Sequence, residues 1–157
     1  MDKTLTATPV SNRTHIGFFG RMNAGKSSLI NALANQPVSI VSAEAGTTTD
    51  VVKKTMEIHG IGPCVLLDTA GFDDVGEIGA QRIAASRRAA ESADIAVILF
   101  GDTGDRTAEK EWIAYFRGSG APVLAVVSHA DERTAAENEA LAAKIGAETG
   151  LKPLIVS

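Results

Sequence analysis

One stretch of the sequence has the residue types and spacing of a phosphate-binding loop. Residues 20–27 are GRMNAGKS, which matches the pattern G-x-x-x-x-G-K-[ST]. Gly20 allows a sharp turn, and Gly25 lets the backbone approach phosphates without an obstructing Cβ atom. Backbone N–H groups in such a loop point inward at the start of a helix and bind anions. Because Lys26 adds a positive charge suited to β- and γ-phosphates, the stretch predicts a triphosphate site.

Two oxygen-bearing side chains are expected to hold Mg²⁺ beside these phosphates. The Ser27 hydroxyl directly follows Lys26, and Asp68 begins the sequence DTAG after an apolar run. A carboxylate at the end of a strand can hold Mg²⁺ through water. Gly71 closes DTAG and can offer its backbone N–H to a γ-phosphate. The two segments together predict a site for a nucleotide with its magnesium ion.

The segment 46–50, GTTTD, supplies hydroxyl groups that could complete the magnesium site. Thr48 is the first choice for a ligand that binds only while the γ-phosphate is present, and Thr47 is the second. A plain polar loop is the alternative, since threonine is common in loops. We expect this loop and DTAG to be ordered by the γ-phosphate and released on hydrolysis.

A further loop, residues 128–131, is expected to contact the base. GTPases usually carry N-K-x-D there, whereas this chain has Ser128, His129, Ala130 and Asp131. The Asp131 carboxylate can accept hydrogen bonds from guanine N1 and N2, a donor pair that adenine lacks. His129 either packs over the base or is a surface histidine. We therefore expect weakened affinity with guanine selectivity retained, and Ser157 is expected to begin a second base-contacting loop.

Alternating strands and helices must position these loops. Strands are predicted at 15–20, 51–59, 63–68, 94–101, 122–128 and 152–157, helices at 26–35, 80–92, 107–120 and from 132 to about 149, and loops at 36–50 and 69–79. Short apolar strands alternating with helices predict an α/β fold, a three-layer sandwich. With the phosphate loop before the first helix, it resembles the Ras-like P-loop GTPase fold. Its mostly parallel sheet should have about six strands and helices on both faces. The candidate loops fall at carboxyl ends of strands, where such sheets bind ligands.

Length and composition predict one domain without a membrane or nucleic-acid partner. The chain has 157 residues, 45% of them hydrophobic, and its net charge is −4 with no basic block. We expect a GTP-binding domain at 14–157 after a mobile arm at 1–13. The single cysteine, Cys64, cannot form an internal disulfide or a multi-thiolate metal site, and its apolar neighbours predict a buried packing role. A cytoplasmic location is the expectation.

With these motifs, the chain resembles the TrmE–Era–EngA group of GTPases and, within it, the HydF-type GTPases of FeFe-hydrogenase maturation. The resemblance covers essentially residues 14–157. It is carried by four stretches: GRMNAGKSSLINAL (20–33), VSIVSAEAGTTTD (38–50), IGPCVLLDTAGFDD (61–74) and GEIGAQR (76–82).

The resemblance implies a nucleotide site with a second cation. Related GTPases with asparagine at the fourth position of the phosphate loop bind K⁺ there, and Asn23 occupies that position. A loop-capping amide is the alternative role for Asn23. GTP or GDP, Mg²⁺ and K⁺ are thus the expected ligands. The residues expected at the nucleotide are Arg21, Met22, Asn23, Ala24, Gly25, Lys26, Ser27, Ser28, Thr47, Thr48, Asp68, Gly71, Ser128, His129, Asp131 and Ser157. Lys26, Thr48 and Gly71 are the candidate catalytic residues.

Slow hydrolysis is expected, because Phe72 stands where Ras-like enzymes place a water-orienting glutamine. Asp74 and Glu77 are both candidates for an acid in that loop. The HydF resemblance also implies a dimerisation domain, an iron–sulfur cluster domain and hydrogenase maturation proteins as partners. The alternatives are a GTP-dependent binding module with negligible hydrolysis, a TrmE/Era-type GTPase unrelated to hydrogenases, and an ATPase, against which Asp131 argues.

Overall fold

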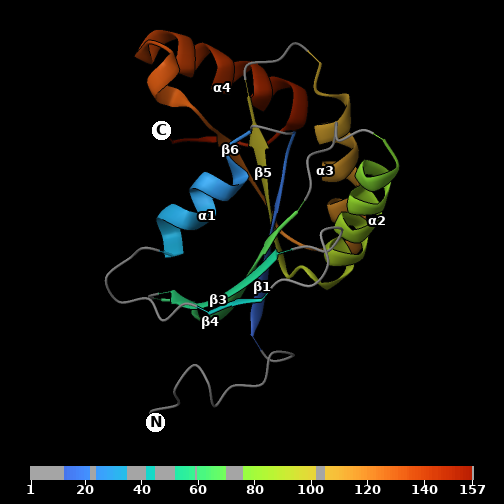
Figure 1. Cartoon of the computed structure of the whole chain (residues 1–157). Coiled ribbons are helices and arrows are strands. Elements are labelled where there is room, and N and C mark those ends of the chain that lie inside the picture. Colours follow the sequence, from blue (N-terminus) through green and yellow to red (C-terminus); the bar gives the residue numbers. More distant parts are fainter. Residues whose placement is uncertain are drawn as a thin grey trace.

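A seven-stranded sheet forms the centre of the protein (Figure 1). The computed structural model describes residues 13–21, 24–34, 42–44, 52–58, 60–69, 76–101 and 105–156. The strand order is β2-β3-β4-β1-β5-β6-β7. The strands are β1 Thr14–Phe19, β2 Ser42–Glu44, β3 Val52–Ile58, β4 Gly62–Asp68, β5 Ile95–Phe100, β6 Val123–Val127 and β7 Leu154–Ile155. The pairings from β4 through β7 are parallel, while β3 runs antiparallel to both β4 and β2.

Helices cover both faces of this sheet, as predicted. They are α1 Lys26–Ala34, α2 Gly76–Ser92, α3 Thr107–Ser119 and α4 Ala135–Thr149, with a short 3₁₀ turn, η3, at Ala130–Glu132. Figure 1 shows α1 on one side of the sheet and α2 and α3 on the other. Ile30 of α1 packs with Phe18, Leu66 and Val97 on the first face. The opposite face buries Phe19, Ile98, Phe100 and Val127 against Ala90, Ile113, Phe116, Leu141 and Ile145. The three-layer α/β sandwich is confirmed.

The observed elements differ from the predicted ones at several boundaries. The structure adds β2 inside the predicted loop 36–50, and α2 begins at Gly76 inside the predicted loop 69–79. Helix α4 begins at Ala135 because Thr134 caps it, forming a capping box with Glu137. The last strand has only two residues, Leu154 and Ile155. Twelve of the thirteen residues of the predicted arm, 1–12, lie outside the described residues.

Cys64 has the packing role predicted for it. Its side chain is completely buried in the core beneath α1. Burial raises the pKa of the Cys64 thiol, because the charged thiolate is disfavoured away from water. The Sγ atom donates a hydrogen bond to the carbonyl oxygen of Gly62 at 3.3 Å. None of the helices in the described part of the chain is long and apolar enough to cross a membrane.

We expect the stability of the fold to fall in acid through three exposed carboxylates. Hydrogen bonds from Thr107 lower the pKa of Asp105, those from Thr134 lower that of Glu137, and those from Arg106 and Lys110 lower that of Glu148. A pKa lower in the folded than in the unfolded state gives stability above the ordinary carboxyl range of about 4. That stability is lost as the pH falls through the folded pKa.

Urea unfolding at pH 5.5 and pH 3.5 measures this effect. The substitution Glu148→Gln should make the free energy of unfolding less dependent on pH, because it removes one of the three groups. Glu139→Gln, an exposed carboxylate on α4, is the matched control and should leave the pH dependence near that of wild type. An acid slope that is the same in all three proteins would contradict the assignment to Glu148.

Candidate functional site

The phosphate loop joins β1 to α1 in the conformation that its glycines allow. Gly25 has a φ of 94°, in the left-handed region that favours glycine. A Cβ atom at Gly20 would lie only 3.1 Å from the carbonyl oxygen of Leu99, so the loop also passes close to β5. The backbone N–H of Ala24 donates to the carbonyl of Arg21 at 3.1 Å, which closes a turn. The structure thus shows a left-handed conformation at Gly25 and a close approach to β5 at Gly20, while the approach of the backbone to phosphates at Gly25 stays a prediction.

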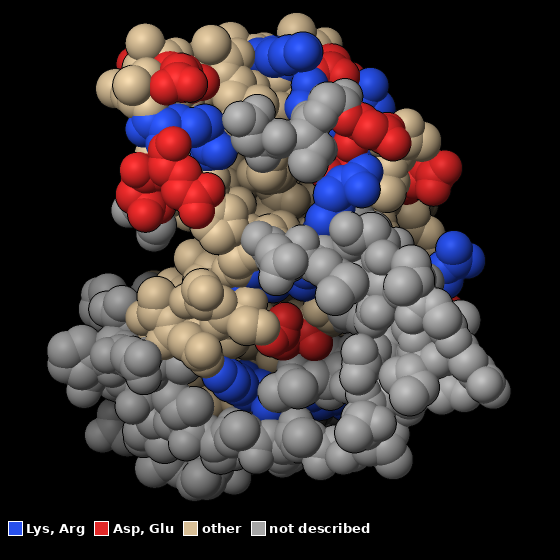
Figure 2. All heavy atoms as spheres, turned by 45° about the horizontal axis from the view of Figure 1, so that its top comes forward, with Lys and Arg blue, Asp and Glu red and all other residues tan. Residues whose placement is uncertain are grey.

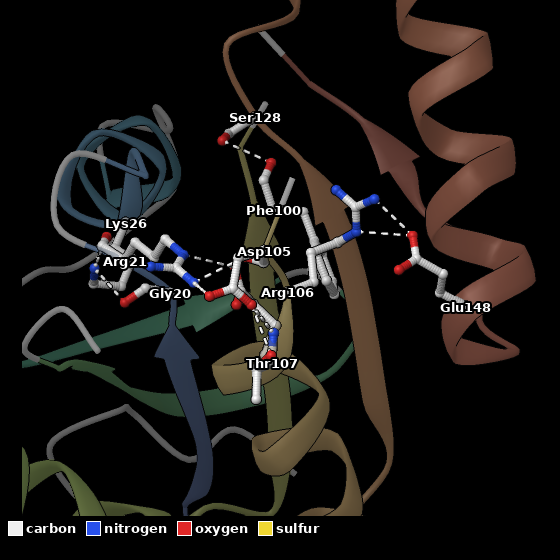
Figure 3. Close-up of polar contacts among 10 residues, drawn as sticks. Gly20, Arg21, Lys26, Phe100, Asp105, Arg106, Thr107, Ser128 and Glu148 are labelled. Carbon is white, nitrogen blue, oxygen red and sulfur yellow. Dashed lines mark hydrogen bonds and ion pairs between the residues drawn. The ribbon is translucent and has the colours of Figure 1, made fainter. Parts of the chain in front are cut away.

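Lys26 folds back over this loop. Its side chain is buried, and its Nζ atom donates hydrogen bonds to the carbonyl oxygens of Gly20 at 3.1 Å and Arg21 at 2.7 Å (Figure 3). The ammonium group therefore lies at the loop, where it can reach an anion held by the loop without a large movement.

The predicted magnesium ligands meet at the carboxyl ends of two neighbouring strands. Because β1 and β4 are parallel and Phe18 is in register with Asp68, the phosphate loop and DTAG begin side by side. The Ser27 hydroxyl donates to Asp68 Oδ2 at 2.6 Å. The Thr69 hydroxyl donates to the carbonyl of Phe18 and fixes the end of β4 against β1. Two oxygen ligands this close fit a hard cation such as Mg²⁺, either directly or through water.

The loop after β6 lies against the phosphate loop. Ser128 donates from its backbone N–H to the carbonyl of Phe100 at 3.1 Å and from its hydroxyl at 3.3 Å. His129 adopts a left-handed conformation with a φ of 57°. Its Nε2 atom would lie 3.4 Å from a Cβ atom at Gly25, so the histidine ring borders the phosphate loop. Asp131 is exposed within η3, on the same loop.

Residues 128–131 form the loop that is predicted to contact the base, here named the base loop. Two residues that the sequence analysis missed, Arg133 and Asn138, donate hydrogen bonds to it. The Arg133 guanidinium donates to the carbonyl of Ser128 and, from Nε, to Asn138 Oδ1 at 2.9 Å. The Asn138 amide donates to the carbonyl of Ala130 at 3.0 Å. The T-x-x-E pattern at 134–137 is typical of the start of a helix. It could have predicted that Asn138 lies in the first turn of that helix.

The structure brings most described candidates to one edge of the sheet. These are Arg21, Ala24, Gly25, Lys26, Ser27, Asp68, Ser128 and His129, with Ser28 exposed on α1 and Asp131 on η3. The predictions for Met22, Asn23, Thr47, Thr48, Gly71, Phe72, Asp74 and Ser157 lie outside the described residues. Glu77 lies in α2, but its side chain is not described.

Glu109 is a further residue that the sequence analysis missed. It is buried in α3, and its Oε2 atom accepts a hydrogen bond from Arg21 Nε at 3.3 Å. The available signal was its spacing to Ile113 and Phe116, which places an acid on the inward face of a helix. On the face that Figure 2 shows, Lys and Arg side chains are interspersed with Asp and Glu among the coloured residues.

Comparisons with known proteins match this geometry. The family model of the 50S ribosome-binding GTPases matches residues 15–129. The tRNA modification GTPase MnmE of Synechococcus elongatus is 39% identical over 131 residues, covering 81% of this chain and 27% of that protein. MnmE of Chelativorans sp. is 38% identical over 137 residues, covering 87% and 29%. The chain thus spans less than a third of the length of these relatives.

Solved structures share the fold. Era, in a complex with MgGDPNP and a segment of 16S ribosomal RNA, aligns with a TM-score of 0.73 at 24% identity, covering 92% of this chain and 50% of that one. The G domain of the T. maritima FeoB iron transporter aligns with a TM-score of 0.62 at 18% identity, covering 93% and 88%.

These relatives confirm the broader resemblance to TrmE- and Era-type GTPases, but they give no support to the narrower one to HydF. The matched residues include the phosphate loop, DTAG and the start of the base loop. The chain belongs to the 50S ribosome-binding GTPase family and is a P-loop GTPase domain of the TrmE/Era type.

Proposed function

We propose that this domain binds GTP with Mg²⁺ and hydrolyses it slowly, with stimulation by K⁺, as a conformational switch. The observation that carries the proposal is the hydrogen bond between Ser27 and Asp68. It lies next to the phosphate loop, where Lys26 donates to the carbonyl of Arg21. A cation ligand pair beside an anion-binding loop is the arrangement that a magnesium–nucleotide complex requires. The family membership supports the same reaction.

Each candidate residue at the phosphates and the cations has a role in this proposal. The backbone around Gly25 and the start of α1 bind the phosphates, and Lys26 offsets charge on the β- and γ-phosphates. Ser27 and Asp68 hold Mg²⁺, which supplies electrostatic stabilisation of the phosphoryl oxygens when it is bound. Thr48 and Gly71 are proposed to contact the γ-phosphate side, and Asn23 is proposed to hold K⁺.

Guanine selectivity is assigned to Asp131, whose carboxylate accepts from the N1 and N2 donors of the base. The Ser128 hydroxyl is engaged with the carbonyl of Phe100, and His129 borders the phosphate loop at Gly25. Neither residue supplies the asparagine and lysine that GTPases usually carry, so a reduced guanine affinity is expected. Ser157 is proposed to begin the second loop at the base.

The test of the proposal is GTP turnover in K⁺ and in Na⁺ at equal ionic strength, with ATP as the control nucleotide. We expect turnover about tenfold or more faster in K⁺, because one well-placed charge in a phosphoryl-transfer site contributes at least that much. The substitution Asn23→Ala should remove the difference between the salts. Asn31→Ala, which removes an exposed amide of α1 outside the loop, should retain it.

Two other results would contradict parts of the proposal. Equal turnover in both salts would remove the K⁺ site. Bound GTP that persists for hours in K⁺ in a single-turnover experiment would favour the second candidate function, a GTP-dependent binding module. The contacts that Lys26 and Arg21 make at the phosphate loop suit either function, whereas only hydrolysis requires the K⁺ effect.

The cellular process in which the switch acts is a separate proposal. The 37–39% identity to MnmE proteins favours a role in tRNA modification. The stretches GTTTD and IGPCVLLDTAGFDD favour the assembly of the FeFe-hydrogenase active-site cluster, with dimerisation and iron–sulfur domains and hydrogenase maturation proteins as partners. Deleting the gene and measuring both tRNA modification and hydrogenase activity distinguishes them, since each proposal predicts the loss of only one.

We also propose that residues 14–157 form one GTP-binding domain of a longer protein, preceded by an arm at 1–13.

A further inference from the structure

Glu109 is a charged side chain in an apolar environment. It lies in the first turn of α3, is 1% exposed, and shares the buried face of the helix with Ile113 and Phe116. Its Oε2 atom accepts the hydrogen bond from Arg21, while its buried Oε1 atom has no hydrogen-bond partner within the part of the chain that the structure describes. Burying a carboxylate is costly unless it is paired, so packing alone does not explain a glutamate here.

The partner of Glu109 is a residue of the phosphate loop. The Arg21 side chain extends from the loop to the start of α3 (Figure 3). Its Nε atom contacts Glu109, and its Nη2 atom donates to the carbonyl of Asp105 at 2.8 Å. The Asp105 carboxylate lies 4.0 Å from the same nitrogen. The planar guanidinium thus contacts the segment just before α3, at Asp105, and the first turn of α3, at Glu109, which a lysine cannot do at once.

The backbone carbonyl of Arg21 accepts hydrogen bonds from within the phosphate loop. Its carbonyl accepts hydrogen bonds from Lys26 Nζ at 2.7 Å and from the N–H of Ala24 at 3.1 Å. This carbonyl therefore takes part both in the turn of the loop and, together with the carbonyl of Gly20, in holding the lysine. The side chain of the same residue contacts Glu109 in α3 and the carbonyl of Asp105.

We infer that Glu109, acting through Arg21, is a positioning residue for the phosphate loop. The pair holds the loop in its binding conformation, so the nucleotide does not have to order it, and binding is stronger for that reason. Glu109 acts on the nucleotide only through Arg21. The inference rests on the proposed nucleotide site and adds a residue, 88 positions away from Arg21 in sequence, that sets its affinity.

The test uses Glu109→Gln and Arg21→Lys in the full chain. We expect release of a fluorescent GDP analogue to be about tenfold faster, equivalent to about 1.4 kcal/mol, and KM for GTP to rise by a similar factor. The value of kcat should stay within about twofold, because the loss of loop order weakens ground-state and transition-state binding alike. The double variant should be little worse than either single variant, since both remove one interaction.

The matched control is Glu148→Gln. It breaks the neighbouring ion pair with Arg106, the residue directly before α3, whose Nη2 atom lies 2.6 Å from Glu148 Oε2. Its unfolding midpoint should fall, while its GDP release and KM stay within about twofold of wild type. A merely structural role for Glu109 would give the two variants the same pattern, and that result would overturn the inference.

Other outcomes are equally decisive. Normal GDP release and KM in Arg21→Lys, whose side chain is partly exposed and tolerates replacement, would overturn the role of the pair even if Glu109→Gln failed to fold. A wild-type chain without nucleotide affinity would overturn the proposed nucleotide site and the role of the pair together. Normal wild-type binding with unchanged variants would overturn the role of the pair alone.

Discussion

Replacing Lys26 with alanine will raise the Kd for GTP by about 100-fold or more. The lysine supplies the positive charge of the phosphate loop at its buried end, and its Nζ atom already lies within hydrogen-bond distance of the carbonyls of Gly20 and Arg21. A charge-assisted hydrogen bond contributes about 1.5–3 kcal/mol, and the β- and γ-phosphates offer two such bonds. At about 1.4 kcal/mol for each factor of ten, their loss corresponds to at least 100-fold.

Equilibrium titration with a fluorescent GTP analogue in Mg²⁺ measures this loss. Lys144→Ala, which removes an exposed lysine of α4, changes the net charge equally and should bind like wild type. The unfolding midpoint should be recorded for both variants, because the Lys26 ammonium also fixes the two loop carbonyls. Unchanged affinity in a folded Lys26→Ala protein would mean that the phosphate site lies elsewhere.

The parts of the site that sequence predicted are those with a local pattern. The phosphate loop, DTAG and the base loop each follow an apolar strand, and parallel pairing of β1 with β4 and of β5 with β6 brings their ends to one edge. The contact between Ser27 and Asp68 follows from that pairing. Strands and helices with strong periodicity were likewise predicted to within a residue or two at most ends.

The missed parts depend on contacts that no local pattern encodes. The pair of Arg21 and Glu109 joins residues far apart in sequence, and only the packing of α3 against β1 and β5 makes them neighbours. Strand β2 has three residues and pairs antiparallel with β3, so its sequence carries too little alternation to distinguish it from a loop. The beginning of α4 was misplaced because η3 intervenes before its cap at Thr134.

The narrower resemblance illustrates a different limit. The motifs that bind phosphate and Mg²⁺ are shared across the whole TrmE–Era–EngA group, so they identify the reaction and not the process in which it acts. The stretches that suggested HydF lie largely in residues 38–50 and 61–74, around the loops that are predicted to respond to the nucleotide. Sequence around a shared chemical site is constrained by that chemistry, so such stretches are a weak guide to one member of the group, and the chain is 38–39% identical to MnmE proteins.

Asp131→Asn will convert the base preference of the site from guanine to xanthine. In the proposed site the aspartate carboxylate accepts from guanine N1–H and from the N2 amino group, whereas an asparagine amide accepts at one atom and donates at the other. Xanthine has a carbonyl in place of the guanine amino group, so its N1–H and O2 match the asparagine. A site built for a polar group discriminates strongly against a base that leaves its groups unpaired.

We expect Asp131→Asn to lower GTP affinity by about 100-fold and to bind xanthosine triphosphate more tightly than GTP, because two charge-assisted hydrogen bonds contribute at least 3 kcal/mol. Competition against a fluorescent GDP analogue measures both affinities, with ATP as a third competitor. Glu132→Gln, on the same exposed turn, is the matched control and should keep the guanine preference.

The gain of xanthine binding separates a role at the base from a loss of folding, since the loop held by Arg133 and Asn138 must remain in place for any base to bind. A variant that loses GTP affinity and gains none for xanthine would show that Asp131 supports the loop and does not contact the base.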